Sequence, residues 1–239
     1  MFVRARFALT VAVAALAAAA SSAAVGAPTV QQVKPTQELA ALLQPHDVRA
    51  GPASASALLE VLATRRPITE ARTVLPVLRR HQDASGRRWL NVMLPGRPNG
   101  RTGWIRQDAT VALATRWHLV VDLARRRVAA YRSGELVRSF PAVVGKPATP
   151  TPRGRFFVEE SVAVAGGAAG APFALALSAR SHVLQRFAGG PGQIALHGLA
   201  NVGGVPGTAV SHGCVRLSGS VMRWLTARIG PGDPVTIRG

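Results

Sequence analysis

The alternation of apolar and polar positions predicts a mainly β protein with two successive zones of short strands. In the first zone, residues 65–113, short apolar segments alternate with clusters of turn-forming residues. These segments are residues 73–78, 89–94 and 103–105. Short strands with frequent turns are typical of small barrels and sandwiches. We therefore expect a small β-barrel over residues 65–113.

The second zone, residues 115–239, continues the strand pattern and adds one helix. Its expected strands are residues 117–123, 127–131, 136–144, 156–159 and 234–237, of which the first two form a hairpin. Ser218 or Ser220 can cap the helix, and Gly230 ends it. Its apolar stripe consists of Val221, Trp224, Leu225 and Ile229. Residues 163–171 are rich in Gly and Ala, and we expect a flexible surface loop there.

The segment before the first zone has an ambiguous pattern. Residues 25–64 are rich in Ala, Pro and Ser, with two short apolar stretches at residues 39–43 and 58–62. Pro45 and Gly51 lie between these stretches. We expect residues 25–64 to be a linker with weak helices, outside any core.

The N-terminus has the order of features of a secretory signal peptide. Arg4 and Arg6 precede an apolar run over residues 7–20, and small residues follow as far as Ala24. The run is shorter than the roughly 20 residues of a transmembrane helix, although an uncleaved membrane anchor is the alternative. We expect residues 1–24 to be a signal peptide and the mature chain to be exported to the periplasm or cell wall.

The formal net charge of +18 comes almost entirely from arginine, since Lys34 and Lys146 are the only lysines. The arginines are scattered along the chain, and Trp and Tyr do not interleave with them. Together with export, this distribution argues against nucleic acid as the partner. We expect a monomer that is attracted to an anionic cell-wall surface.

Cys214 is the only cysteine of the chain, and it lies downstream of His197. A single cysteine in an exported protein cannot form an intrachain disulfide, so it indicates either a reactive thiol or an intermolecular bridge. A nearby imidazole and positive charge favour the thiolate, which is the reactive species. We therefore expect Cys214 to be a nucleophile.

The neighbours of Cys214 suggest the other parts of a catalytic site. His197 is the expected base or ion-pair partner, and the N–H groups of Gly213 and Cys214 are the expected donors to an oxyanion. In an extended segment His212 would point to the face opposite Cys214, whereas Arg216 would share its face. Arg216 can then hold a substrate carboxylate or lower the pKa of the thiol.

Two stretches carry a family resemblance. His197-Gly198, followed by Ser211-His212-Gly213-Cys214-Val215-Arg216-Leu217, resembles the signature of the L,D-transpeptidase catalytic domain of bacterial cell-wall enzymes. Thr151-Pro152-Arg153-Gly154-Arg155-Phe156 is similar to a second segment of that family, and the resemblance covers about residues 115–239. Leu199 departs from the small hydroxyl residue of many members, and Arg216 from the asparagine of some subgroups.

The first zone carries a separate resemblance. Trp89, Val92 and residues 103–105 resemble a bacterial Src-homology-3-like module, a family often associated with cell-wall binding. The same two tryptophans, Trp89 and Trp104, are equally consistent with core positions.

The transpeptidase resemblance implies a mainly β, sandwich-type catalytic domain with one or two helices, and no cofactor or metal. It implies that Cys214 forms a thioester with a peptidoglycan stem tetrapeptide and releases D-alanine, after which a stem amine forms a 3-to-3 cross-link. His197 would be the general base and then the acid. His212 and Gly213 would lie on the oxyanion side, and the substrate-binding set would be Gly198, Ser211 and Arg216. A carbapenem β-lactam would form an adduct with Cys214.

Three other functions stay open at this point. A wall hydrolase or carboxypeptidase would use the same groups with water as acceptor, although papain-like chains place the cysteine before the histidine, and here His197 precedes Cys214. A zinc site from His197, His212 and Cys214 lacks the spacing of common zinc motifs. A non-catalytic wall-binding protein would leave the cysteine without a role. The acyl acceptor is also open, between a diaminopimelate amine, a protein lysine and a free D-amino acid.

Overall fold

A computed structural model describes Met1, residues 33–187 and residues 189–239. Apart from Met1, the expected signal peptide, residues 1–24, lies outside the described residues. In the part of the chain that the structure describes, no helix has the length and apolar character needed to cross a membrane.

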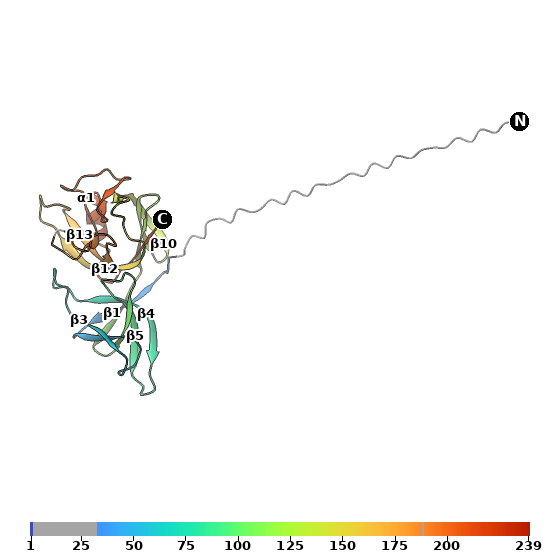
Figure 1. Ribbon diagram of the computed structural model, residues 1–239, viewed down its shortest axis with the longest axis vertical. Helices are drawn as coiled ribbons and strands as arrows, with labels where there is room; N and C mark the ends of the chain where they lie inside the picture. The colour runs from blue at the N-terminus through green and yellow to red at the C-terminus, as the bar shows by residue number, and fades with distance from the viewer. Residues whose placement is uncertain (2–32, 188) are drawn as a thin grey trace. The chain divides into compact units, whose positions relative to one another are not determined.

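The first sheet has seven strands in the order β3-β2-β6-β5-β4-β1-β7 (Figure 1). The strands are β1 (Gln37–Leu42), β2 (His46–Arg49), β3 (Leu58–Leu62), β4 (Val74–Gln82), β5 (Arg88–Met93), β6 (Thr102–Arg106) and β7 (Thr110–Thr115). Antiparallel pairing joins β4, β5 and β6 in sequence, as the turn pattern of the first zone predicts. The Src-homology-3 resemblance of this sheet stays a prediction.

The expectation of a linker with weak helices over residues 25–64 is wrong for its described part. Both apolar stretches are strands, β1 and β3, and β1 lies between β4 and β7 within the sheet. Its last four residues are all buried, so both faces of the strand are covered. Periodicity cannot separate such a short continuous apolar run from a piece of buried helix. The segment is a strand because both of its faces are buried, and this burial depends on the rest of the sheet.

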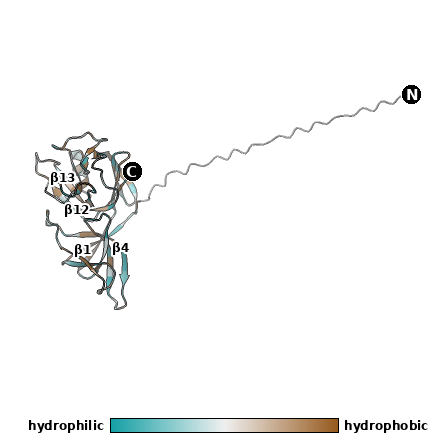
Figure 2. Ribbon diagram, viewed as in Figure 1, coloured by the Kyte–Doolittle hydropathy of each residue, from teal (hydrophilic) through white to brown (hydrophobic). Residues whose placement is uncertain are grey.

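The first sheet has its own hydrophobic core. The core consists of Ala40, Leu42, Val48, Leu62, Leu75, Val77, Leu90, Val92, Met93, Leu94 and Ile105, together with Phe157 from the second zone. The outer half of β4 is exposed and hydrophilic (Figure 2), because its residues 79–82 extend beyond this core.

The second zone forms an eight-stranded sheet in the order β10-β9-β8-β17-β12-β13-β14-β16. Its strands are β8 (Trp117–Asp122), β9 (Arg127–Arg132), β10 (Glu135–Pro141), β12 (Gly154–Ala163), β13 (Phe173–Arg180), β14 (Gln193–Gly198), β16 (Val215–Leu217) and β17 (Pro234–Arg238). A two-stranded parallel pair, β11 (Val144–Gly145) and β15 (Ala209–Ser211), accompanies it.

Strand β12 connects the two halves of this sheet. Its first residues pair with β17, and its residues from Val158 onward pair with β13, with an irregularity between Val158 and Glu160. One core is enclosed by both halves and by α1 (Gly219–Thr226). The expected mainly β, sandwich-type fold is confirmed, with one helix in the described residues. Of the two predicted caps, Ser218 is the N-cap, since its Oγ accepts a hydrogen bond from the Val221 N–H at 3.3 Å.

Strand β12 also links the two zones. Successive side chains of a strand point to opposite faces. Phe156 and Val158 accordingly lie in the core of the second zone, whereas Phe157, only 1% exposed, lies in the core of the first sheet. The described residues from 33 to 239 form one compact unit.

Candidate active site

The candidate site lies at one end of the eight-stranded sheet, where β14 and β16 pair in parallel. In this register His197 is paired with Arg216, and Gly198 with Leu217. Cys214 directly precedes β16, so the pairing brings its backbone beside Ala195 in the middle of β14. The two stretches of the sequence signature thus meet through strand pairing.

A cavity of about 240 Å³ lies over this pair of strands. It is lined by Ala169, Ser181, Leu184, Phe187, Gly192, Gln193, Ile194, His197, Val202, His212, Cys214 and Arg216. Four of the residues that the sequence singled out therefore face one space: Cys214, His197, His212 and Arg216. Most of the remaining lining is apolar, which suits a site that excludes water from a reacting acyl group.

The Cys214 thiol is neutral at rest. Burial raises the pKa of the Cys214 thiol, and this effect outweighs a backbone hydrogen bond and the positive charge of Arg216, which both lower it. Its Sγ lies 3.9 Å from the carbonyl oxygen of Gln193. The expected effect of the positive charge, which favours the thiolate, is present, but desolvation outweighs it.

His197 is oriented by its own backbone neighbour. Its Nδ1 lies 2.8 Å from the carbonyl oxygen of Gly198. A carbonyl only accepts hydrogen bonds, so Nδ1 carries the proton and Nε2 is left as the basic nitrogen. Burial lowers the pKa of His197, and the charge of Arg216 lowers it further. The imidazole is therefore neutral and able to take a proton, and a backbone carbonyl orients it where a third side chain would in a serine-type triad.

The Gly/Ala-rich stretch before β13, expected to be a plain surface loop, packs against this histidine. The Gly170 carbonyl accepts a hydrogen bond from the Gly198 N–H at 2.8 Å, and the Gly170 N–H donates to the Ala200 carbonyl at 2.7 Å. Gly170 has φ +86°, and a Cβ there would lie 2.9 Å from Nδ1 of His197. Only glycine allows this close approach, so the loop fixes one side of the imidazole.

A tight turn presents Cys214. The Ser211 hydroxyl donates to the Cys214 carbonyl at 2.5 Å and accepts from the Gly213 N–H at 3.1 Å. The Thr151 hydroxyl donates to the Gly213 carbonyl at 2.8 Å, so the Thr-Pro segment noted in the sequence buttresses the same turn. Ser211 is fully buried and engaged, and it orients the turn.

The turn changes the expected set of oxyanion donors. The Gly213 N–H is already bonded to Ser211 and is not free for a substrate oxygen. The Cys214 N–H has no acceptor among the described residues, so it is the donor that remains.

His212 lies on the same side as Cys214, not on the opposite face. Residues 212 and 213 form a bend, which breaks the strand alternation on which that expectation depended. The exposed His212 ring stacks on Phe187, with ring centroids 5.4 Å apart and an interplanar angle of 27°. Together these two rings form part of the cavity wall.

Arg216 is engaged with the backbone. Its Nη1 donates to the carbonyls of Val202 at 2.7 Å and Gly203 at 3.1 Å. It therefore fixes the loop after β14, and its charge acts on Cys214 and His197 through space. Its expected effect of lowering the thiol pKa is present. Only Nη1 is engaged by these carbonyls, so a role of Arg216 in holding a substrate carboxylate stays a prediction.

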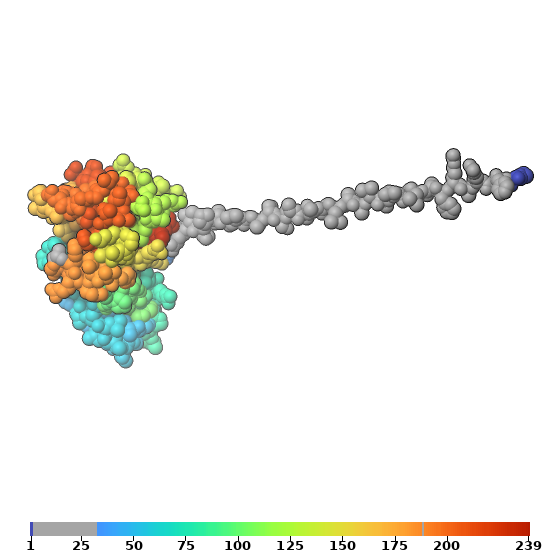
Figure 3. Space-filling view, turned by 45° about the horizontal axis from the view of Figure 1, so that its top comes forward, coloured from blue at the N-terminus to red at the C-terminus, as the bar shows by residue number. Residues whose placement is uncertain are grey.

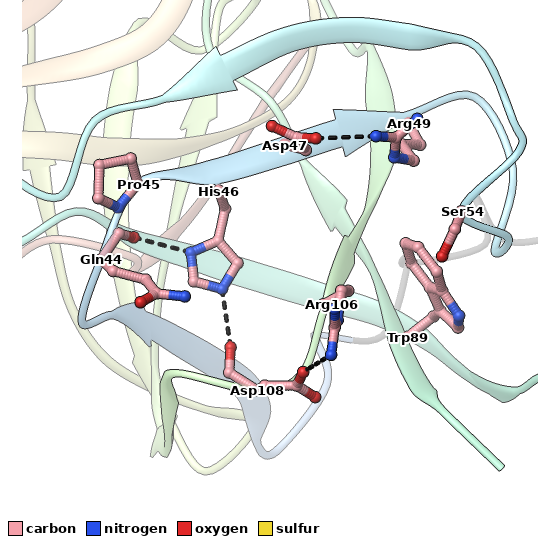
Figure 4. Close-up of a pocket in the computed structure, with 9 residues that line it drawn as sticks. All are labelled: Gln44, Pro45, His46, Asp47, Arg49, Ser54, Trp89, Arg106 and Asp108. Atoms are coloured by element: carbon pink, nitrogen blue, oxygen red, sulfur yellow. Dashed lines mark hydrogen bonds and ion pairs between the residues drawn. The ribbon is translucent and has the colours of Figure 1, made fainter.

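A second cavity, of about 360 Å³, lies in the first sheet (Figure 4). His46 is 5% exposed there, and its two ring nitrogens lie 2.8 and 2.9 Å from the carbonyl oxygens of Gln44 and Asp108. Asp47 pairs with Arg49 at 2.8 Å, and Asp108 pairs with Arg106. Both ring nitrogens of His46 face backbone carbonyls and each of the two carboxylates is paired with an arginine, so the cavity offers no free base to a nucleophile. Trp89 is 1% exposed and is a core residue.

Among the described residues, no group of three or more His, Cys, Asp or Glu side chains is arranged to hold a metal ion. The zinc alternative of the sequence thus gains no support from His197, His212 and Cys214.

Comparison with known proteins identifies the second zone. The family model described as the L,D-transpeptidase catalytic domain (YkuD) matches residues 116–237. L,D-transpeptidase 1 of Mycobacterium tuberculosis is 30% identical over 132 residues, which are 50% of this chain and 49% of that protein. The chain therefore spans about half the length of this relative. The YkuD protein of Bacillus licheniformis is 27% identical over 192 residues, which cover 80% of this chain and 97% of that protein.

Among solved structures, the LD transpeptidase LdtMt1 in complex with imipenem is similar, with a TM-score of 0.43 and 19% identity. The match covers 72% of this chain and 98% of that chain.

Proposed function

The chain belongs to the L,D-transpeptidase catalytic-domain family, and on that premise we propose that it is an exported cysteine transpeptidase of peptidoglycan. In this proposal Cys214 attacks the stem tetrapeptide at the bond to its terminal D-alanine. D-alanine leaves, a thioester forms on Cys214, and an amine of a neighbouring stem resolves it as a 3-to-3 cross-link. The observation that carries the proposal is that the Cys214 thiol and the imidazole of His197, which is oriented by the Gly198 carbonyl, line one cavity.

The first half-reaction follows from the protonation states. As sulfur bonds to the substrate carbonyl carbon, Nε2 of His197 takes the thiol proton, so the reactive thiolate exists only during attack. The Cys214 N–H donates to the oxygen that becomes negative. When the carbon–nitrogen bond breaks, the imidazolium returns its proton to the departing D-alanine amine. The imidazole ends this step neutral.

The second half-reaction reverses these roles. The acceptor amine attacks the thioester, Nε2 of His197 removes a proton from it, and the sulfur leaves. The same proton then returns to sulfur, which restores the resting state. Arg216 stabilises the negative charge on sulfur at both stages, since its charge favours the thiolate.

Export fits the same proposal. The signal peptide expected over residues 1–24 would bring the chain to the stem peptides, in the periplasm or cell wall. The net charge of +18 would favour the anionic wall surface. A carbapenem presents a strained acyl group to the same thiol, so we propose an adduct at Cys214.

The test is intact-mass measurement of the purified mature chain with a stem tetrapeptide and, separately, with a carbapenem. We expect a covalent adduct and D-alanine release for the wild type, neither for Cys214→Ser, and a large loss for His197→Ala. His81→Ala is the matched control, because this exposed histidine of β4 lies in the first sheet.

The products separate the remaining alternatives. Cross-linked dimers formed with an added stem amine support transpeptidation. D-alanine release without a dimer identifies water as the acceptor, and thus a carboxypeptidase. Equal activity of wild type and Cys214→Ser would remove the assignment of the nucleophile, and absence of any adduct would favour a wall-binding protein.

A further inference from the structure

One wall of the catalytic cavity is a loop held by the first sheet. The loop between β13 and β14, residues 181–192, is described except for residue 188, and it contributes Ser181, Leu184, Phe187 and Gly192 to the cavity lining. In Figure 3 the orange surface of this region borders the blue-green surface of the first sheet. The contacts across this border come from residues 94–101, the loop between β5 and β6.

Arg97 is the centre of these contacts. Its Nη1 donates to the carbonyl of Pro191 at 2.8 Å, and its Nη2 donates to the carbonyls of Ser181 at 2.9 Å and Leu184 at 3.1 Å. Ser181 and Pro191 belong to the two opposite limbs of the loop. One planar guanidinium therefore ties both limbs together, which a point-like ammonium could not do with the same geometry.

Asn99 makes a second, reciprocal contact at the start of the same loop. Its Nδ2 donates to the carbonyl of Arg180 at 2.8 Å, and its Oδ1 accepts from the N–H of Arg180 at 2.8 Å. The amide thus pairs with the backbone as a neighbouring strand would. Arg180 ends β13, so Asn99 fixes the point where the loop leaves the sheet.

The backbone of the loop passes close to Arg97 at Gly192, where there is no room for a side chain. Gly192 has φ +65°, and a Cβ at this position would lie 1.9 Å from the Leu184 carbonyl oxygen and 3.1 Å from Nη2 of Arg97. The Ser181 N–H donates to the Gly192 carbonyl at 2.8 Å, which closes the loop at its base. Beyond this base, Phe187 reaches His212 and stacks on it.

We infer that Arg97 and Asn99 are positioning residues of the site that binds the acyl-donor stem peptide, so that the first sheet takes part in substrate binding. They act through the 181–192 loop and set the shape of the cavity in which the stem peptide binds. This inference rests on the proposed function for its substrate. The anchoring itself is independent of that function.

The experiment compares Arg97→Ala, Asn99→Ala and the wild type as full mature chains. Arg88→Ala is the matched control, since this exposed arginine of β5 is in the same sheet. Hydrogen–deuterium exchange should show amides of residues 181–192 exchanging about tenfold faster in Arg97→Ala, with β14 and β16 unchanged. In D-alanine release from the tetrapeptide, KM should rise about tenfold with kcat within about twofold, because the thiol and imidazole do not contact Arg97.

The outcomes distinguish failure of the anchoring, failure of the role in substrate binding and failure of the proposed function. Loop exchange that stays at the wild-type rate in both variants overturns the anchoring. Faster loop exchange with an unchanged KM, or a fall in kcat alone, overturns the role in substrate binding. If the wild type releases no D-alanine, the proposed function fails while the exchange result still decides the anchoring. If Arg97→Ala does not fold, Asn99→Ala provides both measurements.

Discussion

Replacing Glu159 with Gln should destabilise the protein strongly, because Glu159 neutralises two buried arginines. Glu159 is 1% exposed, and its Oε1 accepts hydrogen bonds from Arg180 Nη1 at 2.9 Å and from Gln193 Nε2 at 3.1 Å. It also forms an ion pair with Arg66, which comes from the first zone. Burial lowers the pKa of Arg180 to about 10, so this guanidinium is already poorly solvated. A glutamine side chain keeps the volume but removes the charge.

The size of the destabilisation follows from the two arginines, Arg66 and Arg180, that stay buried in the variant. Arg66 and Arg180 repel one another, since the charge of Arg180 lowers the pKa of Arg66. Removing one partner of a buried ion pair costs about 3–5 kcal/mol. For a chain of this size, about 2–4 °C of Tm corresponds to each kcal/mol. We therefore expect a Tm lower by roughly 6–20 °C, with both zones unfolding together.

Urea unfolding and calorimetry of Glu159→Gln measure this loss. Glu135→Gln is the matched control, because Glu135 of β10 is exposed. This replacement should change the free energy of unfolding by less than about 0.5 kcal/mol. A loss below about 1 kcal/mol for Glu159→Gln would refute the reasoning, since it would mean that water, or Glu160 at 4.0 Å from Arg66, compensates the guanidinium charges without Glu159.

Three further predictions concern the site and one buried carboxyl. Arg216→Ala should shift the pH profile of Cys214 alkylation by iodoacetamide to higher pH, because the Arg216 charge lowers the thiol pKa; an unmoved profile would contradict this. Gly170→Ala should reduce kcat at least about tenfold while far-UV circular dichroism stays unchanged, since its Cβ would displace His197; wild-type kcat would disprove the contact. Burial raises the pKa of Asp233 to about 6. The protonated carboxyl therefore contributes to the free energy of unfolding below about pH 4, and this contribution is lost as the pH rises through about 6. Asp233→Asn should remove up to about 3 kcal/mol of that pH dependence in urea unfolding, and parallel wild-type and variant curves would be inconsistent with it.

The sequence predicts the strands whose pattern is local, and it fails where burial depends on distant partners. The turns around β4, β5 and β6 are encoded by adjacent Gly, Pro and Asp residues, and the corresponding strands are present. The apolar stretch of β1 gives no such signal, because its strand conformation is stabilised by β4 and β7 from later in the chain. The pattern does not predict strands β13 and β14 either, although both are needed to place His197.

In the site, too, the sequence predicts local features and fails where a property depends on distant parts of the chain. The types and spacing of Cys214, His197 and Arg216 indicate a thiol-based site, and the structure brings them to one cavity. Their protonation states could not be predicted, since these depend on how far folding removes water from the thiol and the imidazole. Arg97 could not be singled out either, because its partners are backbone carbonyls, which leave no trace in the pattern of side chains.

The insertion of Phe157 into the core of the first sheet has a consequence for how such a protein can diversify. A recombination event that joined the second zone to an unrelated N-terminal partner would leave this phenyl ring in water and the Glu159 carboxylate without Arg66. The new partner would need both a hollow for the ring and a cation at the right place. We therefore expect the two zones to be inherited together, and chimaeras cut near residue 115 to be insoluble unless residues 157 and 159 are replaced as well.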